Sequence, residues 1–370
     1  MKIVIVGGHL APALAVIEAL PNNTDILYIG RKNALEGDRA DSLEYRKITA
    51  LNIPFENLAT GRFQRKFTKH TIPSLLKLPR GLFKALIILR KYKPDVVMCF
   101  GGYVQIPVAF AAFLLKIPVI THEQTLKAGL ANKIISSVAS AICISWKESE
   151  KYFPKDKTVL TGIPIRKEFV VAKSRPFNKE GAKRIYITGG NLGSHGINLL
   201  VEGCLEKLLE KFHVTHQTGD ARQFNDFERL EKTKSGLPAD LQKKYTLEKF
   251  IDPEEVAFIM VKADLVISRS GMNTITELIF LEKPCILIPL PHGQTNEQLT
   301  NALFVEKIGL GKVLRQSELT SEILYSQIVE FIDKMKDVSK LGLDVHKIIN
   351  NDAAEKIVKI ITEKVKQKKQ

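Results

Sequence analysis

Residues 268–302 read SRSGMNTITELIFLEKPCILIPLPHGQTNEQLTNA, and this stretch decides the fold class of the C-terminal half of the chain. The apolar run that ends at Ser268 predicts a strand, a turn at Gly271 follows, and the pattern from Asn273 onward predicts a helix. A second apolar run at 285–288 predicts the next strand. Strand–helix–strand units of this kind form parallel sheets with right-handed crossovers. The stretch therefore predicts an α/β fold.

The same stretch has the features of a nucleotide-sugar pocket. Gly271 allows a ligand to approach the backbone closely. A helix capped by Asn273 or Thr274 would point its free N–H groups at a bound anion. Glu277, one turn further along, is suited to two neighbouring hydroxyls such as those of a ribose, because a carboxylate accepts two hydrogen bonds at once. Polar side chains suited to sugar hydroxyls fill the next loop: Gln294, Asn296, Glu297, Gln298 and Asn301. The alternative is an ordinary βαβ unit with a polar loop.

Length and composition indicate a two-domain globular protein. With 370 residues the chain is too long for one ordinary core, and its 45% hydrophobic content is typical of soluble domains. The net charge of +15 favours a nucleic acid, an anionic membrane surface or an anionic substrate as partner. Four cysteines, far apart in apolar runs, predict buried thiols in a reducing compartment. No apolar run approaches the ~20 residues that span a bilayer, and no cleaved signal is expected. We therefore expect a cytoplasmic protein.

The N-terminal half repeats the strand–turn–helix pattern. Its predicted strands end at Gly7-Gly8-His9, at Gly101-Gly102-Tyr103 and at His122-Glu123-Gln124-Thr125. Ligands of parallel sheets bind beyond the carboxyl ends of the strands, so we expect these three turns to line one crevice. Residues 31–60 show no clean period and are expected to form loops with short elements.

A second α/β unit is predicted after a linker at 161–166. It begins with a strand at 184–188 and the turn Gly189–Gly193, which resembles a dinucleotide-binding turn only weakly. The predicted architecture is two Rossmann-like domains facing each other across a cleft. Their expected ranges are 1–161 and 162–349, with a C-terminal helix at about 350–370 packing back on the first domain.

Residues 62–93 are rich in Lys and Arg, contain no Asp or Glu and interleave Phe, Ile and Leu. One interpretation is a crossover helix with a solvated basic side, which fits Leu82–Leu89. The other is a basic amphipathic surface that rests on anionic lipid, which the absence of acids favours for the first half. No helix-turn-helix, RNP or zinc pattern accompanies the stretch, so a nucleic-acid partner is not expected.

Four residues are candidates for chemistry. His9 is interpreted either as a structural histidine of its turn or as a general base or phosphate contact. Glu123, beside His122, either accepts the proton of a sugar hydroxyl or holds its loop. Tyr103 is either a hydrogen-bond donor in the cleft or part of the core, and its position after two glycines favours the cleft. Arg166 is a candidate for neutralising a phosphate. No His, Asp or Glu set has metal-site spacing.

Taken together, these segments resemble the MurG family, the membrane-associated N-acetylglucosaminyltransferases of peptidoglycan synthesis in glycosyltransferase family 28. The resemblance spans almost the whole chain in order, in GGHLAPALAV (7–16), KPDVVMCFGGYVQIP (93–107), PVITHEQTLKAGLANK (118–133), GIPIRKEF (162–169), ITGGNLGSHGIN (187–198), FID (250–252), ADLVISRSGMNTITEL (263–278) and PLPHGQTNEQLTNA (289–302).

The resemblance implies a GT-B fold and an inverting hexosyltransferase that needs no metal or other cofactor. It implies transfer of GlcNAc from UDP-GlcNAc to the 4-hydroxyl of MurNAc in undecaprenyl-pyrophosphoryl-MurNAc-pentapeptide (lipid I), which gives lipid II. The first domain would face the lipid-linked acceptor and, through 62–93, the anionic inner face of the cell membrane, and the second domain would bind the donor. Such an enzyme serves cell-wall synthesis and, through it, cell shape and division.

Site residues follow from the resemblance position by position. It implies donor contacts from Arg166, Asn191, Ile251, Met272, Asn273, Thr274, Ile275, Thr276, Glu277, Glu297 and Gln298. Among these, Glu277 is expected on the ribose, Ile251 on the uracil, and Gln298 with Glu297 near the GlcNAc. Gly7, Gly8, Tyr103 and Thr125 would line the acceptor side. His9 and Glu123 are the catalytic candidates, with His9 the better candidate for the base.

The chain departs from the family pattern at three places. The first loop has a single GGH where the family usually reads GGTGGH, Thr125 replaces an asparagine, and Asn191 replaces a serine. These departures make a related GT-B transferase with another lipid or sugar acceptor the first alternative. A UDP-GlcNAc 2-epimerase, which shares the architecture and the donor, is the second. A membrane-bound nucleotide-sugar binder without activity is the third.

Overall fold

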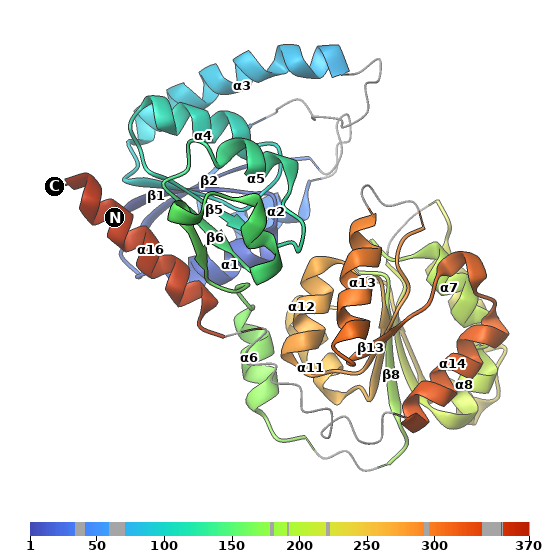
Figure 1. Ribbon diagram of the computed structural model, residues 1–370. Helices are drawn as coiled ribbons and strands as arrows, with labels where there is room; N and C mark the ends of the chain where they lie inside the picture. Colours follow the sequence, from blue (N-terminus) through green and yellow to red (C-terminus); the bar gives the residue numbers. More distant parts are fainter. Residues whose placement is uncertain are drawn as a thin grey trace. The chain divides into compact units, whose positions relative to one another are not determined.

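The structure, a computed structural model, describes residues 1–33, 41–58, 71–177, 181–190, 192–219, 223–291, 296–334, 349 and 351–369. It divides into two compact units: Met1–Arg166 together with Asn350–Gln370, and Lys167–Ile349 (Figure 1). Each unit contains one parallel sheet with helices on both faces. Within the described ranges, no helix combines the length and the apolarity needed to cross a membrane.

The sheet of the first unit has seven parallel strands in the order β3-β2-β1-β4-β5-β6-β7. The strands are β1 (Lys2–Val6), β2 (Asp25–Gly30), β3 (Phe55–Asn57), β4 (Val96–Cys99), β5 (Val119–Glu123), β6 (Ala141–Ile144) and β7 (Thr158–Leu160). Because β1 pairs with β2 on one side and β4 on the other, the strand order reverses between β1 and β4. Ligands of open parallel sheets bind at such a switch point.

Both faces of this sheet are covered because side chains of a strand alternate between its faces. Ile3 and Ile5 pack with α1 and α16, whereas Val4 and Val6 pack with α3 and α4. The helices of the unit are α1 (Leu10–Ala19), α2 (Leu43–Ala50), α3 (Thr71–Tyr92), α4 (Gln105–Leu114), α5 (Leu130–Ile135) and α16 (Ala353–Lys369), with short 3-10 helices η1 (Lys147–Tyr152) and η2 (Lys155–Lys157). The C-terminal α16 lies beside α1 (Figure 1) and buries Ile357 completely.

The second unit has a six-stranded parallel sheet in the order β10-β9-β8-β11-β12-β13, which reverses between β8 and β11. Its strands are β8 (Arg184–Thr188), β9 (His213–Gln217), β10 (Tyr245–Glu248), β11 (Leu265–Ser268), β12 (Cys285–Leu287) and β13 (Gly311–Val313). Its helices are α6 (Lys167–Ser174), α7 (His195–Glu202), α8 (Leu205–Lys211), α9 (Asp226–Ser235), α10 (Ala239–Gln242), α11 (Pro253–Lys262), α12 (Met272–Phe280), α13 (Glu297–Lys307), η4 (Gln316–Glu318) and α14 (Ser321–Lys334).

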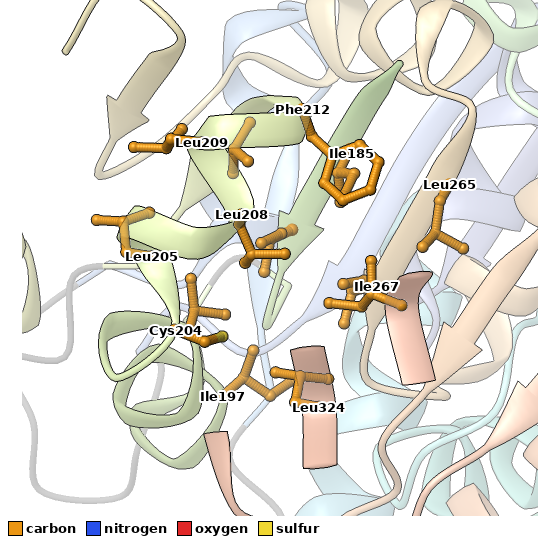
Figure 2. Close-up of a cluster of buried hydrophobic side chains, with 14 of the residues drawn as sticks. Ile185, Ile197, Cys204, Leu205, Leu208, Leu209, Phe212, Leu265, Ile267 and Leu324 are labelled. Atoms are coloured by element: carbon orange, nitrogen blue, oxygen red, sulfur yellow. The ribbon is translucent and has the colours of Figure 1, made fainter. Parts of the chain in front are cut away.

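A core of aliphatic side chains joins one face of this sheet to α7, α8 and α14. Figure 2 shows Ile185 and Ile267 of the strands gathered with Leu208 of α8 and Leu324 of α14. Each of the four is at most 1% exposed. A close-packed core of this kind holds the sheet rigid. The loops that follow β8 and β11 are therefore attached to a rigid support.

Residues 43–50 form α2, one of the short elements expected within 31–60. Ser42 caps this helix by accepting a hydrogen bond from Tyr45 N at 3.0 Å. Only Ile48 in it is fully buried, which is why the sequence shows no clean period. The first unit extends beyond the expected boundary at residue 161. Gly162 N still donates to Ile144 O of β6 at 3.2 Å, and Ile165 is buried.

Candidate active site

The switch point of the first unit brings the first two predicted turns together. The turn 7–9 follows β1 and the turn 101–103 follows β4. His9 N donates to Phe100 O at 2.9 Å, which ties the two turns by a backbone hydrogen bond. Gly101 adopts φ +85°, and an added β-carbon there would lie 2.7 Å from His9 Cδ2. Glycine is therefore required at 101 both for the left-handed backbone and for the space that the imidazole fills.

His9 lies at the switch point with a side chain that stays neutral at pH 7. It is the N-cap residue of α1, yet its side chain makes no cap hydrogen bond. The ring is half-buried, and among the described residues none hydrogen-bonds to it. Burial lowers the pKa of His9 from its ordinary value of 6.5, an effect that the negative charge of Glu123 partly opposes. The imidazole is therefore neutral at pH 7, with nitrogen lone-pair density available for a substrate hydroxyl.

Glu123 is 1% exposed, and four donors surround its carboxylate. Its Oε1 accepts from Thr125 N at 2.9 Å and from Thr125 Oγ1 at 2.5 Å. Its Oε2 accepts from Gly129 N at 2.8 Å and from Asn132 Nδ2 at 2.9 Å. A carboxylate engaged in this way is committed to its loop, so the geometry favours positioning over proton transfer for Glu123. Thr125, 8% exposed, directs its hydroxyl into the same loop.

A buried amide network connects the turn after β4 to the loop after β5. Gln105 Oε1 accepts from Gly101 N at 3.0 Å, and Gln105 Nε2 donates to Asn132 Oδ1 at 2.6 Å. Thr121 Oγ1 donates to the same Asn132 oxygen at 2.9 Å. Sequence reasoning missed Gln105 and Asn132. The available signal was a lone glutamine at the start of an otherwise apolar helix, QIPVAFAAFL. Buried networks that satisfy each polar group fix one arrangement of the surrounding backbone.

Two further residues, His122 and Tyr103, pack against the interior of the first unit. His122 is 1% exposed, and its Nε2 lies 3.0 Å from Ser145 Oγ and 3.3 Å from Gly162 O. Burial lowers the pKa of His122 to about 4, against a smaller opposing effect from the Gly162 carbonyl. The side chain is therefore neutral at pH 7 and shielded from solvent. Tyr103 is half-buried and packs against the core under α3 and α4, and its contact with a ligand stays a prediction.

The second unit places Gly189–Gly193 at its own switch point, directly after β8. A β-carbon on Gly189 would lie 2.3 Å from Ser194 N, and Gly193 combines φ +75° with 1.8 Å to Thr218 O. The helix α7 then begins, with Ser194 as its N-cap. The turn is thus a tight one that requires glycine at both positions. Asn191, expected at the donor, lies outside the described residues.

The turn after β11 corrects one prediction. The helix α12 starts at Met272, with Gly271 as N-cap and no side-chain cap, so Asn273 and Thr274 lie inside the first turn and do not cap it. The physical reason is the extended backbone of Gly271 (φ −64°, ψ 146°), which starts the helix earlier than the side-chain pattern indicated. The first N–H groups of α12 remain free of side-chain caps. A β-carbon on Gly271 would meet no atom within 4 Å.

The predicted donor residues on α12 differ in their exposure to solvent. Asn273 is exposed and Thr274 half-buried, whereas Met272, Ile275, Thr276 and Glu277 are buried. Thr276 Oγ1 donates to Met272 O of its own helix at 2.7 Å. Glu277 raises the pKa of Tyr186 in β8, adding to the larger effect of burial. The charge of the Glu277 carboxylate, on the helix after β11, is therefore felt by a side chain of the neighbouring strand β8.

Gln298 is brought to the same turn by a set of hydrogen bonds. Ser270 Oγ donates to Gln298 O at 2.8 Å, and Asn301 Nδ2 donates to Ser270 O at 3.0 Å. Leu290 N donates to Gln298 Oε1 at 3.1 Å, which orients the side-chain amide. Glu297, the first residue of α13, is exposed. Sequence reasoning had not singled out Ser270 as the residue that connects the turn to α13.

Two donor candidates lie apart from α12. Ile251 is 4% exposed and follows β10, on the carboxyl-end edge of the second sheet. Arg166 is half-buried and is the last residue of the first unit, whereas the other described donor candidates belong to the second. The second sheet thus gathers most of the predicted donor set at one edge.

Comparison with known proteins gives the family. Residues 6–144 match the glycosyltransferase family 28 N-terminal domain, and residues 184–356 match the C-terminal domain of the same family. The UDP-N-acetylglucosamine–N-acetylmuramyl-(pentapeptide) pyrophosphoryl-undecaprenol N-acetylglucosamine transferase of Clostridium perfringens (strain 13) is 36% identical over 94% of this chain and 97% of its own. The enzyme of the same name from Clostridium botulinum (strain Alaska E43) is 34% identical over 99% of both chains.

Solved structures agree. The crystal structure of Acinetobacter baumannii MurG matches with a TM-score of 0.72 and 26% identity over 98% of this chain and 100% of its own. A UDP-GlcNAc 2-epimerase from Neisseria meningitidis matches with a TM-score of 0.65 but only 18% identity, over 98% and 100% of the two chains, which is a likeness of fold alone. On this evidence the chain belongs to glycosyltransferase family 28, as a hexosyltransferase of the MurG group with the GT-B fold.

Proposed function

We propose that this protein transfers GlcNAc from UDP-GlcNAc to the 4-hydroxyl of the MurNAc unit of lipid I, forming lipid II. One observation carries the proposal. In a chain 36% identical to a transferase named for this reaction, each unit keeps a glycine turn and its candidate residues at the switch point of its own sheet. The first unit offers a neutral histidine, and the second offers an uncapped helix and a buried carboxylate.

The chemistry assigned to the first unit is deprotonation of the acceptor. The neutral imidazole of His9 accepts the proton of the MurNAc 4-hydroxyl as the oxygen attacks C1 of GlcNAc from the face opposite the UDP. The bond between C1 and the phosphate oxygen breaks, and UDP leaves with the electron pair, so the configuration at C1 inverts. Glu123 holds the loop after β5 and biases the His9 ring electrostatically, without itself taking the proton.

The second unit is assigned to the donor. The free N–H groups at the start of α12 and the tight turn after β8 suit a diphosphate. Glu277 suits the ribose hydroxyls, and Gln298, oriented by Leu290 N, suits the GlcNAc. Ile251, at the same sheet edge, is assigned to the uracil. We assign Arg166, which ends the first unit, to the same donor.

Association with the membrane is assigned to α3 and α4, which pack against each other (Figure 1). On α3, Phe83 is 67% and Ile87 51% exposed, and on α4, Phe113 is 56% and Leu114 61% exposed. Exposed basic side chains accompany them at Arg80, Lys84, Arg90, Lys91 and Lys116. Large apolar side chains with basic neighbours are suited to an anionic lipid surface. Residues 62–70 of the predicted basic stretch lie outside the described residues.

The test is UDP release from UDP-GlcNAc with and without a short-chain lipid I analogue, on wild type and on His9→Ala. We expect release that depends on the acceptor and that falls by about 10²–10⁴ in the variant. UDP-GlcNAc binding without acceptor-dependent release would instead direct the search to another acceptor. Formation of the 2-epimer without any acceptor would establish an epimerase.

A further inference from the structure

Arg269, the residue after β11, is a buried cation that has no carboxylate partner among the described residues. It is 9% exposed, and burial lowers the pKa of its guanidinium to about 10. Its Nη1 donates to Ile288 O at 2.9 Å and to Pro289 O at 3.2 Å, and its Nη2 donates to Gln316 Oε1 at 2.7 Å. Among the described residues, its Nε–H finds no acceptor and no carboxylate lies within ion-pair distance.

A charge in this position requires an explanation. Removing a charged group from water is strongly unfavourable unless an opposite charge compensates it. Arg229 of α9 shows the usual solution in this unit, with carboxylates of Glu202 and Asp226 at 2.6 and 2.7 Å. The three acceptors of Arg269 are all neutral. They satisfy hydrogen bonds but leave the positive charge uncompensated.

The surroundings of Arg269 favour an anion as the compensating group. Two residues further on, Gly271 is the N-cap of α12, whose first N–H groups have no side-chain cap and carry the positive end of the helix dipole. Open space adjoins this turn, because a β-carbon on Gly271 would meet no atom within 4 Å. The residues from Arg269 to Met272 therefore supply a buried cation, a helix start without a side-chain cap and adjoining open space at the switch point of the sheet.

The same guanidinium also supports the loop that orients Gln298. Its bonds to the carbonyl groups of Ile288 and Pro289 fix the backbone just before Leu290, and Leu290 N is the donor to Gln298 Oε1. Arg269 therefore combines an uncompensated charge with control of a loop next to the turn.

We propose that Arg269 is the buried counter-charge for the diphosphate of the nucleotide-sugar donor and, through residues 288–290, a positioning residue for Gln298. The inference rests on the proposed function and deepens it. It makes the charge of Arg269 a main determinant of the preference of the site for a nucleoside diphosphate over a nucleoside, beside Arg166 and the N–H groups at the start of α12. The charge acts most strongly on the UDP that leaves, because its terminal phosphate gains negative charge as the bond to C1 breaks.

The sharpest test neutralises the positive charge of Arg269 with a neighbouring carboxylate and leaves the arginine itself in place. Gln316→Glu is nearly isosteric and places a carboxylate where the amide oxygen now lies 2.7 Å from Arg269 Nη2. Calorimetric titration with uridine, UMP and UDP then separates nucleoside from phosphate recognition. We expect uridine affinity within about twofold of wild type, UDP affinity about tenfold weaker or more, and a melting temperature that is kept or raised.

Two further variants complete the design. Arg269→Lys keeps the charge but loses the planar fork, so the preference for UDP over uridine should be largely kept while KM for UDP-GlcNAc rises. Lys283→Gln is the matched control, because Lys283 is a second buried cation at 5% exposure that donates to Val261 O and Ala263 O at the opposite edge of the sheet. Its loss should lower the melting temperature and leave the UDP-to-uridine preference unchanged.

Each result decides the inference. If Gln316→Glu binds UDP as tightly as wild type, or loses uridine and UDP affinity by the same factor, Arg269 is not the counter-charge. A loss of UDP preference in Lys283→Gln equal to that in Gln316→Glu would overturn the inference as well, since the effect would then belong to any buried cation of the unit. If wild type itself binds UDP no better than uridine, the proposed function fails first.

Discussion

Gly8 and Gly101 meet backbone to backbone: a β-carbon on Gly8 would lie 2.2 Å from the carbonyl oxygen of Gly101. The contact joins the turn after β1 to the turn after β4, where the strand order of the first sheet reverses. It also places His9 beside Gly101, so the position of the candidate base depends on glycine at both turns.

Gly8→Ala should therefore lower acceptor-dependent turnover by about a hundredfold, since a displacement of about 1 Å at a reacting group has an effect of that size. UDP-GlcNAc affinity should not change, because the described donor candidates other than Arg166 lie in the second unit. Steady-state kinetics together with calorimetry measures both. Gly129→Ala is the control, because the nearest atom to its β-carbon is Glu123 Oε2 at 3.6 Å, an ordinary contact. Equal losses in the two variants would contradict the explanation.

The pH dependence of wild-type kcat/KM should follow His9. Burial lowers its pKa below 6.5, so the neutral, active form persists below the pH at which a free histidine becomes protonated. Activity should stay level as the pH falls to 6.5 and should decline only at lower pH, as the imidazole gains its proton. A rate profile between pH 4.5 and 8 measures this, and His9→Gln should retain no such acid limb in its residual rate. An acid limb centred above pH 6.5 would exclude His9 as the base.

Glu123→Gln separates positioning from proton transfer. The amide replaces one acceptor oxygen with a donor, which must then face a backbone N–H or the Asn132 amide. We expect the free energy of unfolding to fall by about 1–3 kcal/mol, as for an unsatisfied buried group, and KM for the acceptor to rise. Denaturant unfolding and kinetics measure the two effects. A variant with unchanged stability and acceptor KM but a kcat lowered a thousandfold would identify Glu123 as the base instead.

Glu277→Ala should weaken UDP-GlcNAc binding by about 1–3 kcal/mol, the usual loss for charge-assisted hydrogen bonds to hydroxyls. Glu282→Ala is the control, because this carboxylate lies just beyond the same helix and pairs with Lys173 at 2.9 Å on the surface. Calorimetric titration with UDP-GlcNAc measures both variants. Unchanged affinity in Glu277→Ala would mean that the ribose binds elsewhere.

Phe83→Ser combined with Ile87→Ser should reduce sedimentation with anionic vesicles at least about tenfold, because each buried apolar side chain contributes roughly 1.5–3 kcal/mol. Soluble turnover with a short-chain acceptor should be kept. Ile323→Ser, a 42%-exposed residue on α14 of the second unit, is the control. Vesicle binding equal to that of wild type would show that α3 is not the lipid-facing surface.

Much of this molecule was predictable because its signals are local. Strands that end at glycine turns, such as Val6 before Gly7 and Ser268 before Ser270-Gly271, are marked by an apolar run followed by glycine. At Gly7 a side chain would also collide with Glu44 and Tyr28. The family resemblance adds the predicted donor and acceptor residues. The prediction that Asn273 or Thr274 caps α12 was wrong, because helix boundaries depend on backbone angles that neighbouring side chains only bias.

The sequence by itself determined the α/β class, the glycine turns and the residues with suitable chemistry. The tertiary structure alone decided which of them meet. It made Glu123 hold its loop through hydrogen bonds from Gly129 and Asn132, and in the part of the chain that the structure describes it gave Arg269 no carboxylate partner. The physical reason is that a turn or a helix depends on adjacent residues, whereas the partner of a buried polar group comes from strand order and packing over long sequence separations. No local pattern encodes that partner, and the satisfied or unsatisfied state of such groups sets the chemistry of the site.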